Sequence, residues 1–210
     1  MNGALLWART RRWALCLALI LATGAVIVAC GPLSYTLNPA GGYRVAAASQ
    51  APLIAALTIQ GALTPTLLRQ ERQSARPLQP WRLLHVLGLT TIAAIVVAIA
   101  ATFLTPPANV LLNATAPLGP IALVRDFLAF TGAALITAAV IGPALAWALP
   151  LAWAILPATV AGPDPDPTGI LRLATQPDSA TVPLATAVTI WIIGAVLAVA
   201  GVKTSRRADR

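Results

Sequence analysis

The sequence predicts an all-α integral membrane protein, a polytopic bundle of about six transmembrane helices with both ends in the cytoplasm. Three observations predict this fold class. Of the 210 residues 58% are hydrophobic and 10% are charged, the mean hydropathy is +0.81, and the charges punctuate long apolar runs. Soluble domains are about 45–50% apolar and about 25% charged. A soluble fold of this size cannot bury so many apolar side chains, so we expect residues 1–210 to form a single transmembrane domain covered by lipid.

Six apolar runs have the length of membrane spans, because crossing the hydrocarbon core takes about 20 mostly apolar residues. The expected spans are residues 13–30, 46–68, 83–104, 121–141, 143–161 and 182–202.

Polar residues and prolines delimit these runs. Arginines precede the first, Arg69 stops the second, Thr105-Pro106-Pro107 ends the third and Lys203 closes the last. The stretch 121–161 carries no charge after Asp126, and at about 40 residues it is too long for one crossing. We expect Gly142-Pro143 to divide it into two spans and Pro150 to kink the second of them.

The distribution of Lys and Arg predicts the orientation, because cytoplasmic loops of membrane proteins are enriched in both residues. An N-in, C-in topology places most of the 14 basic residues inside. These are Arg9, Arg11, Arg12, Arg69, Arg72, Arg76, Arg82, Lys203, Arg206, Arg207 and Arg210. The outer side then holds Arg44, Arg125 and Arg172 together with Asp126, Asp164, Asp166 and Asp178. We expect a multi-pass protein of the cell (inner) membrane.

The end of the first span admits a second interpretation. Ile27-Val28-Ala29-Cys30 resembles a bacterial lipobox behind a basic and then an apolar stretch. In that interpretation Cys30 is the lipidation site, and cleavage before it would leave five spans and put the new N-terminus outside. Cys16 and Cys30 are about 21 Å apart on one helix, too far for a disulfide.

The sequence lacks the residues that several classes of function require. The net charge of +8 lies in loops between apolar runs and forms no stripe that would bind nucleic acid. His85 is the only histidine, and prolines alternate with Asp164 and Asp166, so no metal site is expected. The sequence contains no phosphate-binding glycine loop and no nucleophile–base pair. We therefore expect no enzyme activity and no cofactor, and any ATP would be bound by a partner.

The polar segment 69–82 between the second and third spans has two readings. It can be an anchor with Trp81 at the membrane interface, or a docking element for a cytoplasmic partner. A short helix over Leu67–Ala75 would align three arginines on one face. The candidate contact residues are Arg69, Glu71, Arg72, Arg76, Trp81 and Arg82.

Four polar residues fall inside the expected spans. Arg125 and Asp126 follow Pro120 closely, so both side chains could reach the interface; we favour a structural ion pair over a substrate site. Gln60 is expected to form an interhelical hydrogen bond. His85, without companion ligands, is expected to have a packing or interfacial role.

Three stretches resemble small six-span permease subunits of ABC-type (ABC-2-like) exporters from high-GC actinobacteria. They are Ser74–Arg82, Val124–Leu135 with Gly142–Pro150, and Trp191–Arg207. The resemblance implies a permease that pairs with a second permease copy or homologue and with a separate ATP-binding subunit. It also implies that Arg69, Glu71, Arg72 and Arg76 belong to the coupling loop. The exported compound would be hydrophobic or peptide-like.

Three other classes stay open. One is a non-transporting accessory, anchor or immunity protein of a membrane complex. Another is a small secondary transporter built from two three-helix repeats. The last is a membrane enzyme.

Overall fold

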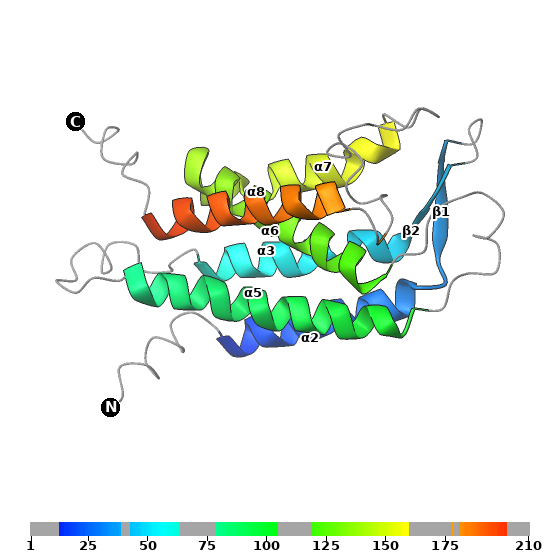
Figure 1. Ribbon diagram of the computed structural model, residues 1–210, viewed down its shortest axis with the longest axis horizontal. Helices are drawn as coiled ribbons and strands as arrows, with labels where there is room; N and C mark the ends of the chain where they lie inside the picture. The colour runs from blue at the N-terminus through cyan, green and yellow to red at the C-terminus, as the bar shows by residue number, and fades with distance from the viewer. Residues whose placement is uncertain are drawn as a thin grey trace.

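The helices of the computed structural model pack side by side in one bundle (Figure 1). The structure describes residues 13–38, 43–63, 79–104, 119–159, 178 and 181–200. Within them lie the α-helices α2 (Trp13–Cys30), α3 (Pro52–Leu63), α5 (Gln79–Thr102), α6 (Pro120–Val140), α7 (Ala148–Thr159) and α8 (Thr181–Ala200). Two short 3-10 helices, η1 (Ala47–Gln50) and η3 (Pro143–Leu145), precede α3 and α7.

Each of the predicted spans overlaps one of these helices. Helix α2 has the predicted bounds, and α5, α6 and α8 differ from theirs by a few residues. Helix α3 begins at Pro52, six residues later than its expected span. Residues 64–78, which include the helix predicted over Leu67–Ala75, lie outside the described residues.

The break predicted at Gly142-Pro143 is present. Ile141 and Gly142 donate backbone hydrogen bonds to the carbonyl of Thr137 at 2.9 and 3.2 Å, which ends α6. Gly142 then turns the chain with φ of 123°, a backbone conformation that residues with a Cβ atom rarely adopt. The kink predicted at Pro150 is wrong, because α7 begins at Ala148. Pro150 therefore lies in the first turn of α7. Backbone N–H groups in the first turn of a helix have no acceptor within the helix, so a proline there removes no hydrogen bond and causes no kink.

Four helices in the described part of the chain are long and apolar enough to cross a membrane. They are Trp13–Cys30, Arg82–Thr102, Pro120–Val140 and Thr181–Ala200. Helices α3 and α7 have 12 residues each, or about 18 Å. This set of apolar helices indicates a membrane protein.

A two-stranded antiparallel hairpin was not expected from the sequence. Strand β1 (Ser34–Asn38) pairs with β2 (Tyr43–Ala46), and the register shifts between Thr36 and Asn38. The hairpin lies beyond the end of the bundle (Figure 1), so the bundle itself is helical, as predicted. Tyr, Thr and Val in these strands favour extended backbone.

The helices run alternately in opposite directions along the bundle (Figure 1). At one end, here called the Trp13 end, the Trp13 Nε1–H donates to His85 Nδ1 at 3.0 Å and joins the starts of α2 and α5. At the other, the hairpin end, Gly31 lies against Leu104, after the ends of the same two helices. Helix α6 contacts α3, α5, α7 and α8, and its contact with α8 is the most extensive among the described elements.

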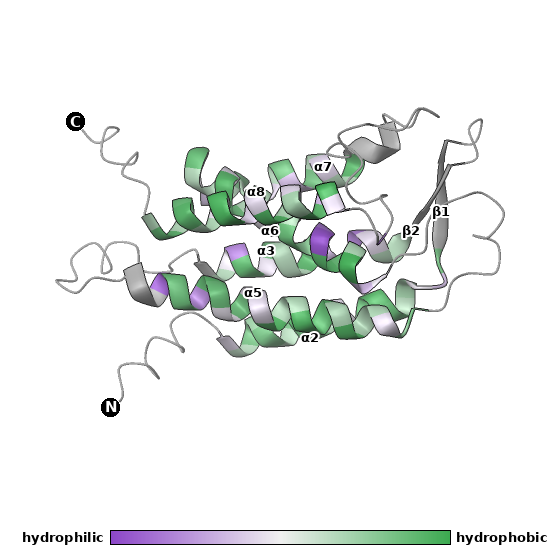
Figure 2. Cartoon of the chain, in the orientation of Figure 1, coloured by the Kyte–Doolittle hydropathy of each residue, from purple (hydrophilic) through white to green (hydrophobic). Residues whose placement is uncertain are grey.

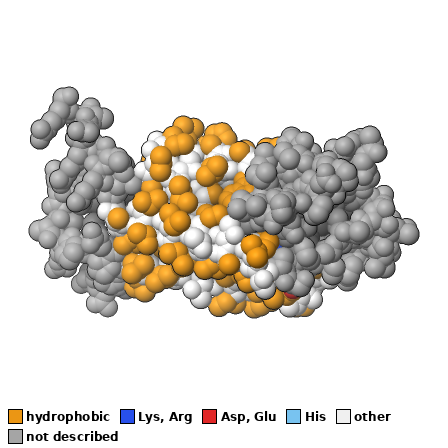
Figure 3. All heavy atoms as spheres, turned by 45° about the horizontal axis from the view of Figure 1, so that its top comes forward, with side chains coloured by type: hydrophobic (Ala, Val, Ile, Leu, Met, Phe, Trp, Pro, Cys, Tyr) orange, Lys and Arg blue, Asp and Glu red, His pale blue; other side chains and the backbone are white. Residues whose placement is uncertain are grey.

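The surface of the bundle is apolar. Large hydrophobic side chains are exposed on every long helix, for example Leu21, Ile99, Val140 and Val196. Figure 2 shows few hydrophilic positions along the helices, and Figure 3 shows hydrophobic side chains over the described part of one face. Such a large exposed apolar surface is not found on soluble monomers. Lipid is the environment that fits it.

Candidate functional site

Helix α6 is the central helix of the described bundle. In α6, 72% of the residues in the span are buried, whereas the share is 22–39% in the other three long helices. Leu123 and Phe127 pack toward α2, α3 and α5, whereas Phe130 packs against α3 and α7, and Ala129 against α7 and α8. Any polar group on this helix is therefore surrounded by protein.

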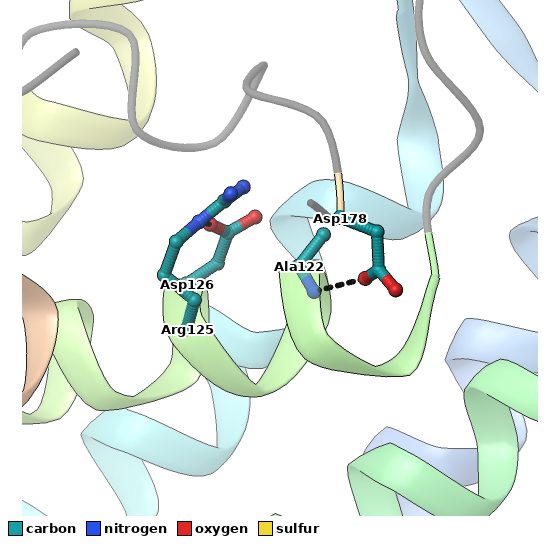
Figure 4. Close-up of polar contacts among 4 residues, drawn as sticks. All are labelled: Ala122, Arg125, Asp126 and Asp178. Atoms are coloured by element: carbon teal, nitrogen blue, oxygen red, sulfur yellow. Dashed lines mark hydrogen bonds and ion pairs between the residues drawn. The ribbon is translucent and has the colours of Figure 1, made fainter. Parts of the chain in front are cut away.

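Arg125 and Asp126 form an ion pair within this helix. Arg125 Nε lies 3.1 Å from Asp126 Oδ1, and the two side chains are 1% and 0% exposed. Figure 4 shows the guanidinium group lying against the carboxylate. Neither side chain extends to the bundle surface, so the expectation that both could reach the interface is wrong.

Burial of this ion pair costs free energy. Asp126 is six residues past the start of α6, about 9 Å along its axis. Asp126 Oδ2 has no hydrogen-bond partner in the described structure. Removing two charges from water can cost more than their mutual attraction returns, and charges at membrane depth usually serve a function.

The start of α6 is capped by a residue from a distant part of the chain. Gly119, the N-cap, supplies no side-chain hydrogen bond. Instead the Ala122 backbone N–H donates to Asp178 Oδ1 at 2.6 Å (Figure 4). A Cβ at Gly119 would collide with the Asp178 carboxylate. The negative charge also complements the helix dipole.

The sequence alone predicts Asp178 only as one of the outer acidic residues. The one available signal was the Gly119-Pro120 pair, which starts a helix without a capping side chain of its own.

His85 and Gln60 both lie in the interior. His85 is 1% exposed and Gln60 9%. The His85 Nδ1 accepts the Trp13 hydrogen bond, so its ring proton is on Nε2. The two rings meet edge to face with centroids 5.3 Å apart. The His85 ring packs against Trp13. The packing or interfacial role of His85 and the interhelical hydrogen bond of Gln60 stay predictions.

Most of the candidate coupling residues fall outside the described part of the chain. Arg69, Glu71, Arg72 and Arg76 lie outside the described residues, as does the side chain of Trp81. Arg82 is half-buried at the start of α5. The charged pair on α6 and the basic segment are therefore separate candidates.

No other reactive cluster is found in the described ranges. No group of three or more His, Cys, Asp or Glu side chains there could hold a metal ion, and no disulfide joins Cys16 to Cys30. No protein-family model, curated protein or solved structure matches this chain.

Proposed function

We propose that the chain crosses the cell (inner) membrane six times, with both ends inside, and acts as the transmembrane permease subunit of an ABC exporter. It moves a hydrophobic or peptide-like compound, and a separate subunit hydrolyses the ATP. The proposed assembly contains a second permease copy or homologue.

The gathering of helix ends is the observation that carries the proposal. The start of α2, the end of α3, the start of α5 and the end of α8 lie together at the Trp13 end (Figure 1). The sequence next to these ends contains the arginines of residues 9–12, 69–82 and 203–210. The positive-inside rule makes that end cytoplasmic. The hairpin end, with Asp178, is then external.

The two short helices are compatible with six crossings. Helix α3 continues η1, and α7 follows η3. At about 1.5 Å per residue in an α-helix and about 2.0 Å in a 3-10 helix, each pair extends for about 25 Å, close to the thickness of the hydrocarbon core.

One feature favours a permease over a simple anchor. The end of α3 and the start of α5 both lie at the Trp13 end (Figure 1), and residues 64–78 join them in the sequence. An ATP-binding partner would dock at this connection. Motion of the partner would be transmitted to the helices through that connection.

Reversing two arginine charges tests the docking role. Arg72→Glu combined with Arg76→Glu is expected to weaken co-purification of a cytoplasmic ATPase by about thirtyfold and to abolish stimulated ATP hydrolysis. Loss of a charge-paired contact costs about 2 kcal/mol of binding. Partner recovery from native membranes is measured by quantitative mass spectrometry, and ATP hydrolysis in the purified complex.

The matched control is Arg206→Glu with Arg207→Glu, which reverses the same charge on the same side of the membrane outside the connection. It should leave both readouts unchanged. Full binding and hydrolysis in the Arg72/Arg76 variant would show that the segment is only an anchor, as in a non-transporting accessory protein.

A further inference from the structure

Helix α7 is attached to the bundle through one face. On this face Pro150 and Ala154 are buried and Trp153 is half-buried. The helix lies at the edge of the bundle (Figure 1), and large apolar side chains are exposed on its other face. These are Leu149, Leu151 and Ile155. In the proposed membrane, α7 therefore has protein on one side and lipid on the other.

Side chains form the attachment of α7, whereas α8 is held to α6 through its backbone. Ala154 packs with Ala56 of α3 and Phe130 of α6, and Trp153 lies against the same cluster. By contrast, a Cβ on Gly132 of α6 would collide with the backbone of α8. Within a membrane, lipid tails can replace apolar side-chain contacts, while close backbone packing holds helices together. Helix α7 is therefore held more weakly than α8.

The chain enters α7 through a glycine in a special conformation. Gly142 has φ of 123° and ψ of 160°, which almost only glycine adopts. A Cβ there would meet no atom within 4 Å, so the backbone conformation and not a lack of space requires glycine. Pro143 follows and has no N–H to donate to α6. Hinges are commonly a few residues at the ends of elements that absorb backbone changes, and this junction has that character.

Helix α7 can also move into lipid without exposing a charge. Its sequence, ALPLAWAILPAT, contains no ionisable residue. Helix α6 cannot leave the bundle in this way, because it carries Arg125 and Asp126, and charges in lipid are costly.

We propose that α7 is a hinged cover that turns about Gly142 and opens the apolar face of α6 at Ala129 and Phe130. The inference rests on the proposed transport function and names the route by which the compound leaves. Gly142 follows the end of α6 at the proposed cytoplasmic side, so the displacement grows toward the external end of α7. The face therefore opens to the outer half of the membrane, where an exporter delivers an apolar compound.

Distances between spin labels test this movement in the purified full-length protein in lipid nanodiscs. The labels are attached to cysteines at exposed positions, in a background with Cys16→Ala and Cys30→Ala. One pair joins α3 to α7 (Ile54→Cys with Ile155→Cys), and the other joins α3 to α8 (Ile54→Cys with Ile192→Cys). Double electron–electron resonance should give a shorter and a longer distance for the α3–α7 pair and one distance for the α3–α8 pair.

Two variants should shift the α3–α7 distances. Gly142→Ala disfavours the backbone conformation of the closed state and should raise the ratio of open to closed molecules by about tenfold. Trp153→Ala removes the largest side chain between α7 and α6 and should also raise this ratio. Gly61→Ala is the matched control, because a Cβ there also meets no atom within 4 Å and Gly61 lies inside helix α3. It should leave the distances unchanged.

Two results would overturn the hinge. Unchanged α3–α7 distances in both Gly142→Ala and Trp153→Ala would show that α7 is a fixed part of the bundle. An equal change in the α3–α8 pair would show a general loosening of the protein and not a movement at Gly142. Neither measurement needs an ATPase, so failure here is distinct from failure of the Arg72/Arg76 test.

Discussion

Asp126→Ala is expected to destabilise the folded protein by about 3–5 kcal/mol, the usual effect of breaking a buried ion pair. The Arg125 side chain is 1% exposed and would lose its ion pair with the Asp126 carboxylate. Because α6 contacts four other helices, the damage should reach the whole bundle. Membrane abundance and the melting temperature in detergent measure the loss.

Removing both charges is the matched control. Arg125→Met with Asp126→Leu replaces the pair with apolar side chains, and such replacements are often neutral or stabilising. The double variant should therefore be closer to the wild type than Asp126→Ala. If Asp126→Ala is as abundant and as stable as the wild type but fails in transport, the pair is a substrate site and not a structural ion pair.

Gly132→Leu is expected to cost about 3 kcal/mol or more, because the new side chain has no space. A Cβ there would lie 2.7 Å from the backbone of Ile190 and of Trp191. Backbone atoms cannot rotate away as the end of a side chain can. Close approach of small residues is also a main source of helix association in membranes.

Gly88→Leu provides the comparison. Gly88 is also inside a helix, but a Cβ there would meet no atom within 4 Å. Its melting temperature should match or exceed that of the wild type, since glycine lowers helix stability. Equal loss in both variants would mean that the α6–α8 contact contributes nothing specific.

The helices could be predicted because each long apolar run has clear ends. Arginines before Trp13 and the Gly142-Pro143 break give boundaries that the structure keeps. The hairpin could not be predicted in this way, because strands of five and four residues are too short to show a period. Helix α7 starts later than its run because Pro143 begins a 3-10 turn.

The candidate site was partly visible in the sequence. Arg125 and Asp126 stand out as charges in an apolar run, but the sequence does not show that both side chains are buried. The Asp178 cap joins positions 56 residues apart. No local sequence pattern predicts contacts between segments that lie far apart in the sequence.

The topology of the chain tests the central claim most directly. Reporter fusions after Ala75 and after Arg207 should be active as cytoplasmic fusions, and fusions at Asn113 and Asp166 should be active as external ones. This result follows from six crossings with the arginine-flanked helix ends inside. A cytoplasmic signal at Asp166 would contradict the six-span arrangement.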